Sequence, residues 1–310
     1  MTLTCLFSAG LDAFDAYAAP LRDALGRAGL DAQIVTDAPP GSVDYIIYAP
    51  SGTLVDFTPY TRCKAVLSLW AGVERIIGNP TLTQPLARMV DPGLTQGMIE
   101  YVTGHVLRHH LGMNAHLRAR PGDWHPVEPP LAEERVVGFL GLGVLGTSCA
   151  QALCGLGFQV IGWSASPKTL PGIQCDSGAD GLKTVLQQSE ILVTLLPHTA
   201  QTEALLDATR LQQMRRGAVL INPGRGALID DDALLAALDQ GLIAHATLDV
   251  FRTEPLPETH PFWHHPQVTV TPHIAATTRP ASAARRIVEN IARVERGETL
   301  LNEVSRTNGY

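Results

Sequence analysis

The sequence lacks the features of a secreted or membrane-spanning protein. No apolar run approaches the roughly 18 residues that a membrane-spanning helix needs. The first residues do not combine a basic region with an apolar core, so we expect no secretory signal. The five cysteines are odd in number and form no Cys-x-x-Cys pair, which is typical of reduced, mostly buried thiols. We therefore expect a cytoplasmic protein without a membrane partner.

The chain also lacks internal repeats and an excess of positive charge. Its formal net charge is −7, which argues against nucleic acid or an anionic membrane surface as the main partner. The 28 glycines and 22 prolines are spread along the chain and 45% of the residues are hydrophobic, as in a globular protein. At 310 residues the chain is too long for one small core, so we expect two domains.

The most informative stretch lies in the middle of the chain. Residues 136–140 are all apolar or glycine, as in a buried parallel strand, and they lead into Gly141-x-Gly143-x-x-Gly146. A helical pattern at 147–156 and a second strand at 159–163 follow, which predicts half of a mononucleotide-binding unit. The first glycine would allow the tight turn, the second the approach of a pyrophosphate, and the third close packing of helix on strand. The alternative is a glycine-rich turn without a ligand, because such turns are common.

Strand-like and helix-like segments alternate on both sides of this motif. We predict an α/β protein with two doubly wound parallel-sheet domains. A Rossmann cofactor domain at residues 99–274 is inserted into a flavodoxin-like substrate domain at residues 1–98 plus 275–310. A long helix at 96–117 leaves the first domain, and a proline-rich surface excursion follows at 118–134. The predicted strands are residues 3–7, 33–36, 45–48, 64–69, 136–140, 159–163, 191–196, 218–221, 244–250 and 268–271, and the last helix begins at Pro280.

Three polar residues follow predicted strands of the second domain. Arg225 lies between two glycines, Glu254 follows an apolar run, and His273 follows Pro272. Such strand ends meet at the crevice beside a bound dinucleotide. The set suits the reduction of a 2-oxo acid, because histidine can protonate the carbonyl oxygen, a carboxylate can fix the ring, and arginine can bind the substrate carboxylate. Taken singly, these residues could be a surface turn arginine, an exposed loop acid and a capping histidine.

Three motifs then occur in order after the glycine-rich turn. They are INPGRGA at 221–227, LDVF-x-x-EP at 248–255 and TPHIA at 271–275. Over about residues 60–310 the chain resembles the D-isomer-specific 2-hydroxyacid dehydrogenase family. Further details resemble its glyoxylate/hydroxypyruvate reductase A branch: Trp163-Ser164, LLP at 195–197, PLP at 255–257, FW-x-HP at 262–266 and the C-terminal Gly309-Tyr310.

The resemblance implies an enzyme that reduces small 2-oxo acids, such as glyoxylate and hydroxypyruvate, with a nicotinamide cofactor. It makes Arg225 the substrate-binding and catalytic arginine, His273 the proton donor and Glu254 the partner of His273. Amides around Ala71, Gly72 and Val73, next to Trp70, would receive the substrate carboxylate. The resemblance also implies a cleft between the two domains and a homodimer joined through the cofactor domain. Two alternatives remain: a dehydrogenase for a larger 2-oxo acid, and a non-catalytic protein that senses dinucleotides.

Cofactor contacts are expected from residues at the strand ends. They are Gly141, Gly143, Val144, Leu145, Gly146, Ser164, Ser166, Lys168, Leu196, Pro197, Thr202, Pro223, Gly224 and Asp249. NAD selection normally needs an acidic residue after the second strand, and none occurs between residues 155 and 175. The two serines and the lysine at 164–168 could instead bind a 2′-phosphate, which predicts that NADPH is preferred and that NAD remains possible. The alternative is a solvated loop in which the lysine has no role.

Several other residues have two interpretations. Trp70 occupies a position where the family has a small residue, so it either narrows the substrate pocket or lies in the core. Tyr48 belongs to the core, the rim or the same pocket. His105 and His109 have metal-ligand spacing, and further histidines cluster at 260–265. We expect no metal, because no HExxH accompanies them and hydride transfer needs none; a polar or interface helix face is the interpretation we favour.

Overall fold

The computed structural model describes residues 2–306, so the Gly309-Tyr310 pair of the sequence resemblance lies outside the described residues. The chain forms two compact units. Unit 1 comprises Met1–Leu94 with Thr278–Tyr310, and unit 2 comprises Thr95–Thr277. The boundaries predicted from the sequence, 98/99 and 274/275, lie three or four residues from these divisions.

Unit 1 contains a five-stranded parallel sheet with the order β2-β1-β3-β4-β5, as in flavodoxin-like folds. Its strands are β1 (Leu3–Ser8), β2 (Ala32–Val35), β3 (Tyr45–Tyr48), β4 (Ala65–Ser68) and β5 (Leu86–Ala87). Every residue of β3 and β4 is buried, because helices or loops cover both faces of a parallel sheet.

Helices α1 (Leu11–Arg27) and α8 (Pro280–Glu295) of unit 1 pack against each other. Pro280 occupies the first turn of α8, where its missing N–H costs no hydrogen bond. The apolar face of α8 includes Ile287 and Ile291, both buried. Arg286 of the same helix donates to the Val90 carbonyl at 2.9 Å. The C-terminal helix therefore belongs to the unit formed by the first 94 residues, as the sequence predicts.

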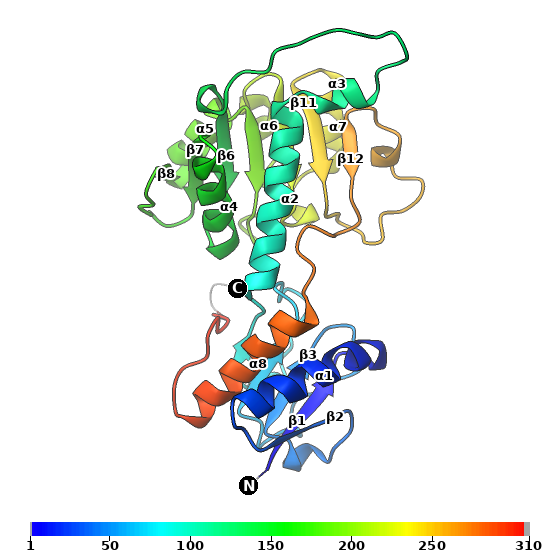
Figure 1. Ribbon diagram of the computed structural model, residues 1–310. Helices are drawn as coiled ribbons and strands as arrows, with labels where there is room; N and C mark the ends of the chain where they lie inside the picture. The colour runs from blue at the N-terminus through cyan, green and yellow to red at the C-terminus, as the bar shows by residue number, and fades with distance from the viewer. Residues whose placement is uncertain (1, 307–310) are drawn as a thin grey trace. The chain divides into compact units, whose positions relative to one another are not determined.

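Unit 2 contains a seven-stranded sheet with the order β12-β11-β10-β9-β6-β7-β8, and each pair of neighbours is parallel (Figure 1). Its strands are β6 (Val136–Leu140), β7 (Gln159–Ser164), β8 (Ile173–Ser177), β9 (Ile191–Thr194), β10 (Ala218–Asn222), β11 (Ile243–Leu248) and β12 (Val268–Val270). The strand order reverses at β6, which lies between β7 and β9. Ligands of open α/β sheets bind at such a switch point, beside the carboxyl ends of the strands.

Helices cover both faces of this sheet (Figure 1). Helices α2 (Pro92–His110) and α4 (Val144–Gly155) lie on one face; α5 (Gly178–Gln188), α6 (Ala208–Gln213) and α7 (Asp231–Asp239) lie on the other. Alternate residues of β6 enter different cores: Val137 and Phe139 pack with α2 and α4, whereas Leu140 packs with the opposite helices. The predicted fold class, two doubly wound parallel sheets, is confirmed.

Two predicted helices have different bounds in the structure. The single helix expected at 96–117 is wrong: α2 ends at His110, and α3 (Met113–Leu117) begins after Gly112, whose φ of 64° interrupts helical geometry. Helix α4 begins at Val144 rather than at residue 147, because Gly146 packs inside its first turn. Short 3₁₀ turns lie at Pro40–Ser42, Ala132–Glu134, Gly226–Leu228 (η3) and Pro261–Trp263.

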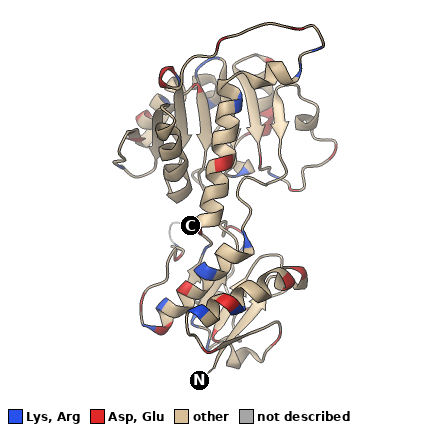
Figure 2. Cartoon of the chain, viewed as in Figure 1, with Lys and Arg blue, Asp and Glu red and all other residues tan. Residues whose placement is uncertain are grey.

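Charged side chains lie mainly on helices and loops, and the strands of both sheets carry few of them (Figure 2). Strands buried on both faces have no solvent for a charge, so most of their residues are apolar. Within residues 2–306, no helix combines the length and the apolar character needed to cross a membrane.

Candidate active site

The glycine-rich turn joins β6 to α4, and its three glycines have different surroundings. Gly141 has a φ of 106°, and a Cβ there would lie 2.5 Å from the Leu195 carbonyl oxygen. A Cβ on Gly146 would lie 1.9 Å from the Gly141 oxygen. Around Gly143, by contrast, no heavy atom lies within 4 Å of a built Cβ. The packing of the turn therefore requires glycine at positions 141 and 146. Gly143, at the N-terminus of α4, has open space around it, and a pyrophosphate fits there.

The loop after β7 carries the residues expected to select NADPH. Ser164 is buried, and its hydroxyl donates to the Ser166 carbonyl at 2.7 Å. The Lys168 ammonium donates to the carbonyl of Leu142, inside the glycine-rich turn. Ser166 and Lys168 are both exposed, so each presents a polar group to solvent beside the turn. Because the Ser164 hydroxyl donates its proton to the Ser166 carbonyl, it does not donate to a 2′-phosphate in this conformation. The sequence did not predict this hydrogen bond.

The turn after β9 is held by one hydroxyl. Thr202 donates to the Pro197 carbonyl at 2.7 Å and accepts from the Thr199 N–H at 2.8 Å. Leu196 and Pro197 precede this turn at the carboxyl end of the strand. The predicted cofactor residues after β6, β7, β9, β10 and β11 therefore share one edge of the unit 2 sheet, because parallel strands present their carboxyl ends on the same side.

Arg225 lies in a tight loop that Asn222 braces. The Asn222 amide oxygen accepts from the Thr194 hydroxyl at 2.6 Å and from the Gly224 N–H at 3.1 Å, and its amide nitrogen donates to the Arg225 carbonyl at 2.9 Å. Arg225 itself is half-buried, and its Nη1 donates to the Gly224 carbonyl at 2.7 Å. A Cβ on Gly226 would lie 2.1 Å from the Phe251 backbone carbon, so this loop touches the loop that leads to Glu254.

Glu254 and His273, 19 residues apart in the chain, form a direct pair. The distance between His273 Nδ1 and Glu254 Oε2 is 2.7 Å, and Glu254 Oε1 accepts from the Phe251 N–H at 2.9 Å. A carboxylate can only accept hydrogen bonds, so Nδ1 carries a proton and Nε2 faces away from the glutamate. Because 55% of the His273 side chain is exposed, Nε2 is accessible to a substrate.

Asp249, which is completely buried, fixes the backbone on which His273 lies. Its Oδ1 accepts from the Thr271 hydroxyl at 2.6 Å and the Ile274 N–H at 2.9 Å, and its Oδ2 accepts from the Ala275 N–H at 2.9 Å. His273 adopts a φ of 53°, an unusual value for a residue with a side chain. Three hydrogen bonds to one buried carboxylate explain how the loop keeps this conformation.

Tyr101 of α2 extends this arrangement. Its hydroxyl lies 2.7 Å from Thr271 Oγ1, and since the Thr271 proton goes to Asp249, Tyr101 must be the donor. Sequence reasoning placed Asp249 only at the cofactor and missed Tyr101. The available signal was weak: an acidic residue after a buried strand, and a tyrosine on the face of a helix.

The predicted substrate residues Trp70, Ala71 and Gly72 follow β4 in unit 1. The Trp70 N–H donates to Ser68 Oγ at 3.0 Å. Because Trp70 is 38% exposed, the alternative that it lies in the core is wrong. Tyr48 is buried and packs edge-on against Phe57, as expected for a core residue.

The two histidines with metal-ligand spacing pack against other rings, and His105 lies beside Tyr101. His109 Nε2 lies 3.0 Å from the Thr247 hydroxyl, and its ring lies beside that of His245. Burial lowers the pKa of His109 to about 3 and that of His245 to about 4, so both rings are neutral near neutral pH. His260 and His265 pair with different aspartates, Asp231 and Asp239. Among residues 2–306, no three His, Cys, Asp or Glu side chains form a group that could hold a metal ion.

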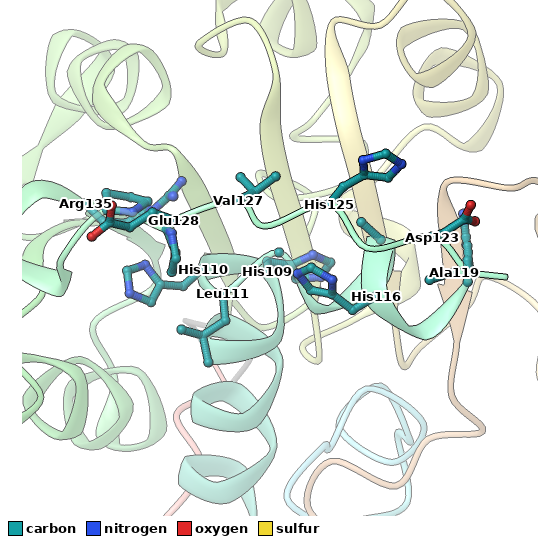
Figure 3. Close-up of a pocket in the computed structure, with 15 residues that line it drawn as sticks. His109, His110, Leu111, His116, Ala119, Asp123, His125, Val127, Glu128 and Arg135 are labelled. Carbon is teal, nitrogen blue, oxygen red and sulfur yellow. The ribbon is translucent and has the colours of Figure 1, made fainter. Parts of the chain in front are cut away.

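A hollow of about 440 Å³ lies at the other edge of the unit 2 sheet, near the amino end of β6 (Figure 3). The end of α2, helix α3 and the following loop line it, with His110, His116, His125 and Arg135 among its residues. The glycine-rich turn and the Glu254–His273 pair lie at the carboxyl ends of the strands, so this hollow is not part of the candidate active site.

Comparison with known proteins identifies the family. A family model described as "D-isomer specific 2-hydroxyacid dehydrogenase, NAD binding domain" matches residues 104–275, which is more than half of the chain. The chain belongs to the D-isomer specific 2-hydroxyacid dehydrogenase family. The matched residues contain the glycine-rich turn, Arg225, Glu254 and His273, so the candidate site lies within the family's NAD binding domain.

Curated relatives also confirm the predicted branch of this family. The glyoxylate/hydroxypyruvate reductase A of Serratia proteamaculans is 42% identical over 257 residues, covering 80% of this chain and 82% of that protein. The protein of the same name from Yersinia enterocolitica is 41% identical over 255 residues, with the same coverage of both.

Two solved structures of the family contain a bound cofactor. A D-isomer specific 2-hydroxyacid dehydrogenase from Xanthobacter autotrophicus, in complex with NADPH and MES, is 40% identical with a TM-score of 0.93 and full coverage of both chains. The NADPH-dependent glyoxylate/hydroxypyruvate reductase of Sinorhizobium meliloti, in complex with NADP and sulfate, is 32% identical with a TM-score of 0.85, covering 100% of this chain and 99% of that one.

Proposed function

We propose that this protein reduces small 2-oxo acids, with glyoxylate and hydroxypyruvate as the preferred substrates, to 2-hydroxy acids at the expense of NADPH. The observation that carries the proposal is the 2.7 Å contact between His273 and Glu254, at the sheet edge that also carries the glycine-rich turn. The names of the relatives and the NADPH or NADP in the related structures support it.

The chain's own residues supply the rest of the chemistry. When held beside the glycine-rich turn, NADPH would supply the hydride that the carbonyl carbon of the substrate accepts. His273, held by Glu254 through Nδ1, donates the Nε2 proton to the carbonyl oxygen, which completes the alcohol. Arg225 binds the substrate carboxylate through its planar guanidinium and stabilises the charge that develops on the oxygen. Glu254 stabilises the imidazolium before the transfer and keeps the ring in its orientation afterwards.

A panel of 2-oxo acids, each assayed with NADPH and with NADH by the absorbance of the reduced cofactor, tests this function. We expect turnover of glyoxylate and hydroxypyruvate with a higher kcat/KM for NADPH. A higher kcat/KM for large branched or aromatic 2-oxo acids would identify the other substrate class. Binding of NADPH without turnover of any 2-oxo acid would identify a dinucleotide-sensing protein instead of an enzyme.

We infer that the preference for NADPH comes from the exposed polar groups beside the glycine-rich turn. Lys168 supplies a positive charge next to the turn and Ser166 an exposed hydroxyl, both suited to a 2′-phosphate. The segment 155–175 contains no acidic residue that would repel that phosphate. Asp176 of β8 is the register partner of Trp163 in the sheet, and its carboxylate accepts from the Gln174 amide at 2.9 Å.

We also infer that two copies of the chain associate through the arm, defined as residues 111–131. Six large apolar side chains of the arm are exposed: Leu111, Met113, Leu117, Trp124, Val127 and Leu131. Trp124 is 89% exposed, which is costly for a tryptophan unless a partner covers it. A second copy of the chain is the partner that the family resemblance suggests.

The cysteines agree with a cytoplasmic location, which we propose for the protein. All five are free thiols, and Cys5, Cys63 and Cys149 are buried. Burial raises the pKa of Cys149 to about 12, so this thiol is unreactive near neutral pH. Unpaired thiols suit a reducing compartment.

A further inference from the structure

Arg252 lies in the loop between β11 and Glu254 and contacts two other loops of unit 2. Its Nη2 donates to the carbonyls of Ile229 at 2.8 Å and Ala227 at 3.2 Å, and its Nε also donates to Ile229 at 3.1 Å. Its Nη1 donates to Glu203 Oε1 at 2.6 Å. The side chain is 36% exposed, yet all these hydrogen bonds go to the chain's own atoms.

The two carbonyls belong to the segment that directly follows Arg225. This segment contains the short turn η3, whose first residue, Gly226, lies against the backbone of Phe251 and Arg252. A Cβ on Gly226 would lie 2.5 Å from the Arg252 nitrogen, so the two loops are already in backbone contact. The guanidinium adds directed hydrogen bonds to that contact and fixes one loop relative to the other.

The third segment is the turn after β9, and it is joined to η3 independently of Arg252. The Ala204 N–H donates to the Ala227 carbonyl at 2.8 Å, and the Leu206 N–H donates to the Leu228 carbonyl at 2.9 Å. Glu203 of the same turn is bonded to both Arg252 and His198, and the hydrogen bond from Arg252 holds the pKa of Glu203 below its usual range. Segments 198–206 and 225–229 thus form one block, to which Arg252 attaches the Glu254 loop.

We propose that Arg252 is a positioning residue of the reaction: it fixes the loop that carries Glu254, and through Glu254 the ring of His273, against the loop that carries Arg225. The proposal rests on the proposed function, in which Arg225 binds the substrate carboxylate and His273 donates the proton. These two groups must keep their spacing, because a misplacement of about 1 Å can lower the rate of an enzyme about 100-fold.

Only an arginine can make this set of contacts. The guanidinium is planar and presents several N–H donors in fixed directions, so one side chain reaches two carbonyls and a carboxylate at once. A lysine at this position would keep the positive charge opposite Glu203 but would lose the planar set of N–H donors that reaches the two carbonyls. Because exposed ion pairs contribute little to stability, retaining the charge alone should not preserve the geometry.

The test uses Arg252→Gln and Arg252→Lys, with Arg216→Gln as the matched control. Arg216 is also exposed and donates to one carbonyl, that of Gln240, but it lies at the amino end of β10, away from the site. We expect both Arg252 variants to lower kcat/KM for glyoxylate with NADPH by about 10- to 100-fold. The Kd for NADPH, measured by fluorescence titration, should change less than about two-fold, and Arg216→Gln should match the parent in both measurements.

A double variant distinguishes positioning from a general structural effect. If Arg252 acts through the placement of Arg225, then the losses in Arg225→Lys and Arg252→Gln overlap, and the double variant loses less than the product of the two. Strictly multiplicative losses, or an Arg252→Lys enzyme with the kcat/KM of the parent, would overturn the proposal.

Hydrogen exchange provides a readout that needs no turnover. In Arg252→Gln, peptides covering residues 225–230 and 250–255 should exchange at least about five-fold faster than in the parent and in Arg216→Gln, while peptides from α5 should not change. If the parent reduces no 2-oxo acid, the proposed function fails, and the exchange data still decide whether Arg252 fixes these loops. Unchanged exchange in both peptides would overturn the inference.

Discussion

At the scale of single residues, the candidate site depends on backbone geometry as much as on side chains. His273 has a left-handed φ of 53°, and the buried carboxylate of Asp249 holds the following two amides. The sequence motifs predict which residues carry the chemistry. They do not predict the φ angle or the three hydrogen bonds of Asp249, because these depend on how the loop after β12 packs against the residue that follows β11.

His273→Ala should lower kcat for glyoxylate by about 10² to 10⁴, the usual contribution of a positioned general acid. The Kd for NADPH should stay close to that of the parent, because the glycine-rich turn is untouched. His264→Ala, which changes an exposed histidine outside the site, serves as the control in the same steady-state assay. A His273→Ala enzyme with kcat within two-fold of the parent would contradict the assignment.

The cofactor preference should reverse in the double variant Ser164→Asp with Lys168→Ala. The change removes the ammonium beside the glycine-rich turn and adds a negative charge at the end of β7, next to the exposed groups that would bind the 2′-phosphate. We expect the ratio of kcat/KM for NADPH over NADH to fall by at least about 100-fold, since a lost attraction and a new repulsion each change binding by roughly ten-fold. Lys183→Ala, on the exposed side of α5, should leave the ratio unchanged. An NADH preference in the parent enzyme would show that the interpretation of this loop is wrong.

At the scale of elements, strand positions could be predicted better than helix bounds. Residues 45–48 were predicted as a strand and form β3, because a short apolar run between turn residues leaves little choice. Strand β8 was missed because it lies at the sheet edge and buries only Ile173. Helix α5 was also missed, although Leu182, Val185 and Leu186 have helical spacing and are buried on one face.

In the candidate site, too, the positions at strand ends could be predicted from the sequence and the loop contacts could not. The order of the motifs predicts that Arg225, Glu254 and His273 reach one sheet edge, because they follow neighbouring parallel strands. The 2.7 Å pairing of Glu254 with His273 and the role of Arg252 depend on loop conformations, which no periodic pattern encodes.

The packing of His109 of α2 on His245 of β11 predicts a pH dependence of stability. His109 and His245 are neutral in the folded chain, because burial lowers the pKa of His109 to about 3 and that of His245 to about 4. In the unfolded chain they take up protons near pH 6.5, so the unfolded state binds more protons between about pH 6.5 and 4. The free energy of unfolding should therefore fall as the pH decreases through this window.

Urea unfolding at pH 7.5 and pH 4.5 can measure this contribution. His245→Gln should lose about 2 kcal/mol less than the parent over this interval, because glutamine can bond Thr269 without titrating. His116→Gln, an exposed histidine of α3, should lose as much as the parent. Equal losses in all three proteins would contradict the role assigned to the buried histidines.

At the scale of the whole molecule, the chain consists of two units with separate sheets and separate cores, and the arm extends from unit 2. The arm is the part of unit 2 with the most exposed apolar side chains and the fewest buried ones. If a second copy covers them, polar substitutions there should affect assembly rather than folding.

Leu117→Asp combined with Trp124→Asp should convert a dimer into a monomer, because burial of two carboxylates in an apolar interface is strongly unfavourable. Analytical ultracentrifugation at micromolar concentration measures the mass directly. Val55→Asp, an exposed apolar residue of unit 1, is the control and should leave the mass unchanged. A monomeric parent, or a double variant that stays dimeric, would exclude the arm as the interface.

The chain enters unit 2 after Leu94 and leaves it at Thr277, so unit 1 is built from both ends of the sequence. During translation, unit 2 is complete before α8 has been synthesised. The first 94 residues must therefore wait on the ribosome without the helix whose Ile287 and Ile291 belong to their core. The nascent chain thus exposes an unfinished apolar surface for the time needed to make about 180 residues, which at 5–20 residues per second is roughly 10 to 40 seconds. During this interval, unit 1 is the part of the protein that most needs a chaperone to keep its exposed apolar surface from aggregating.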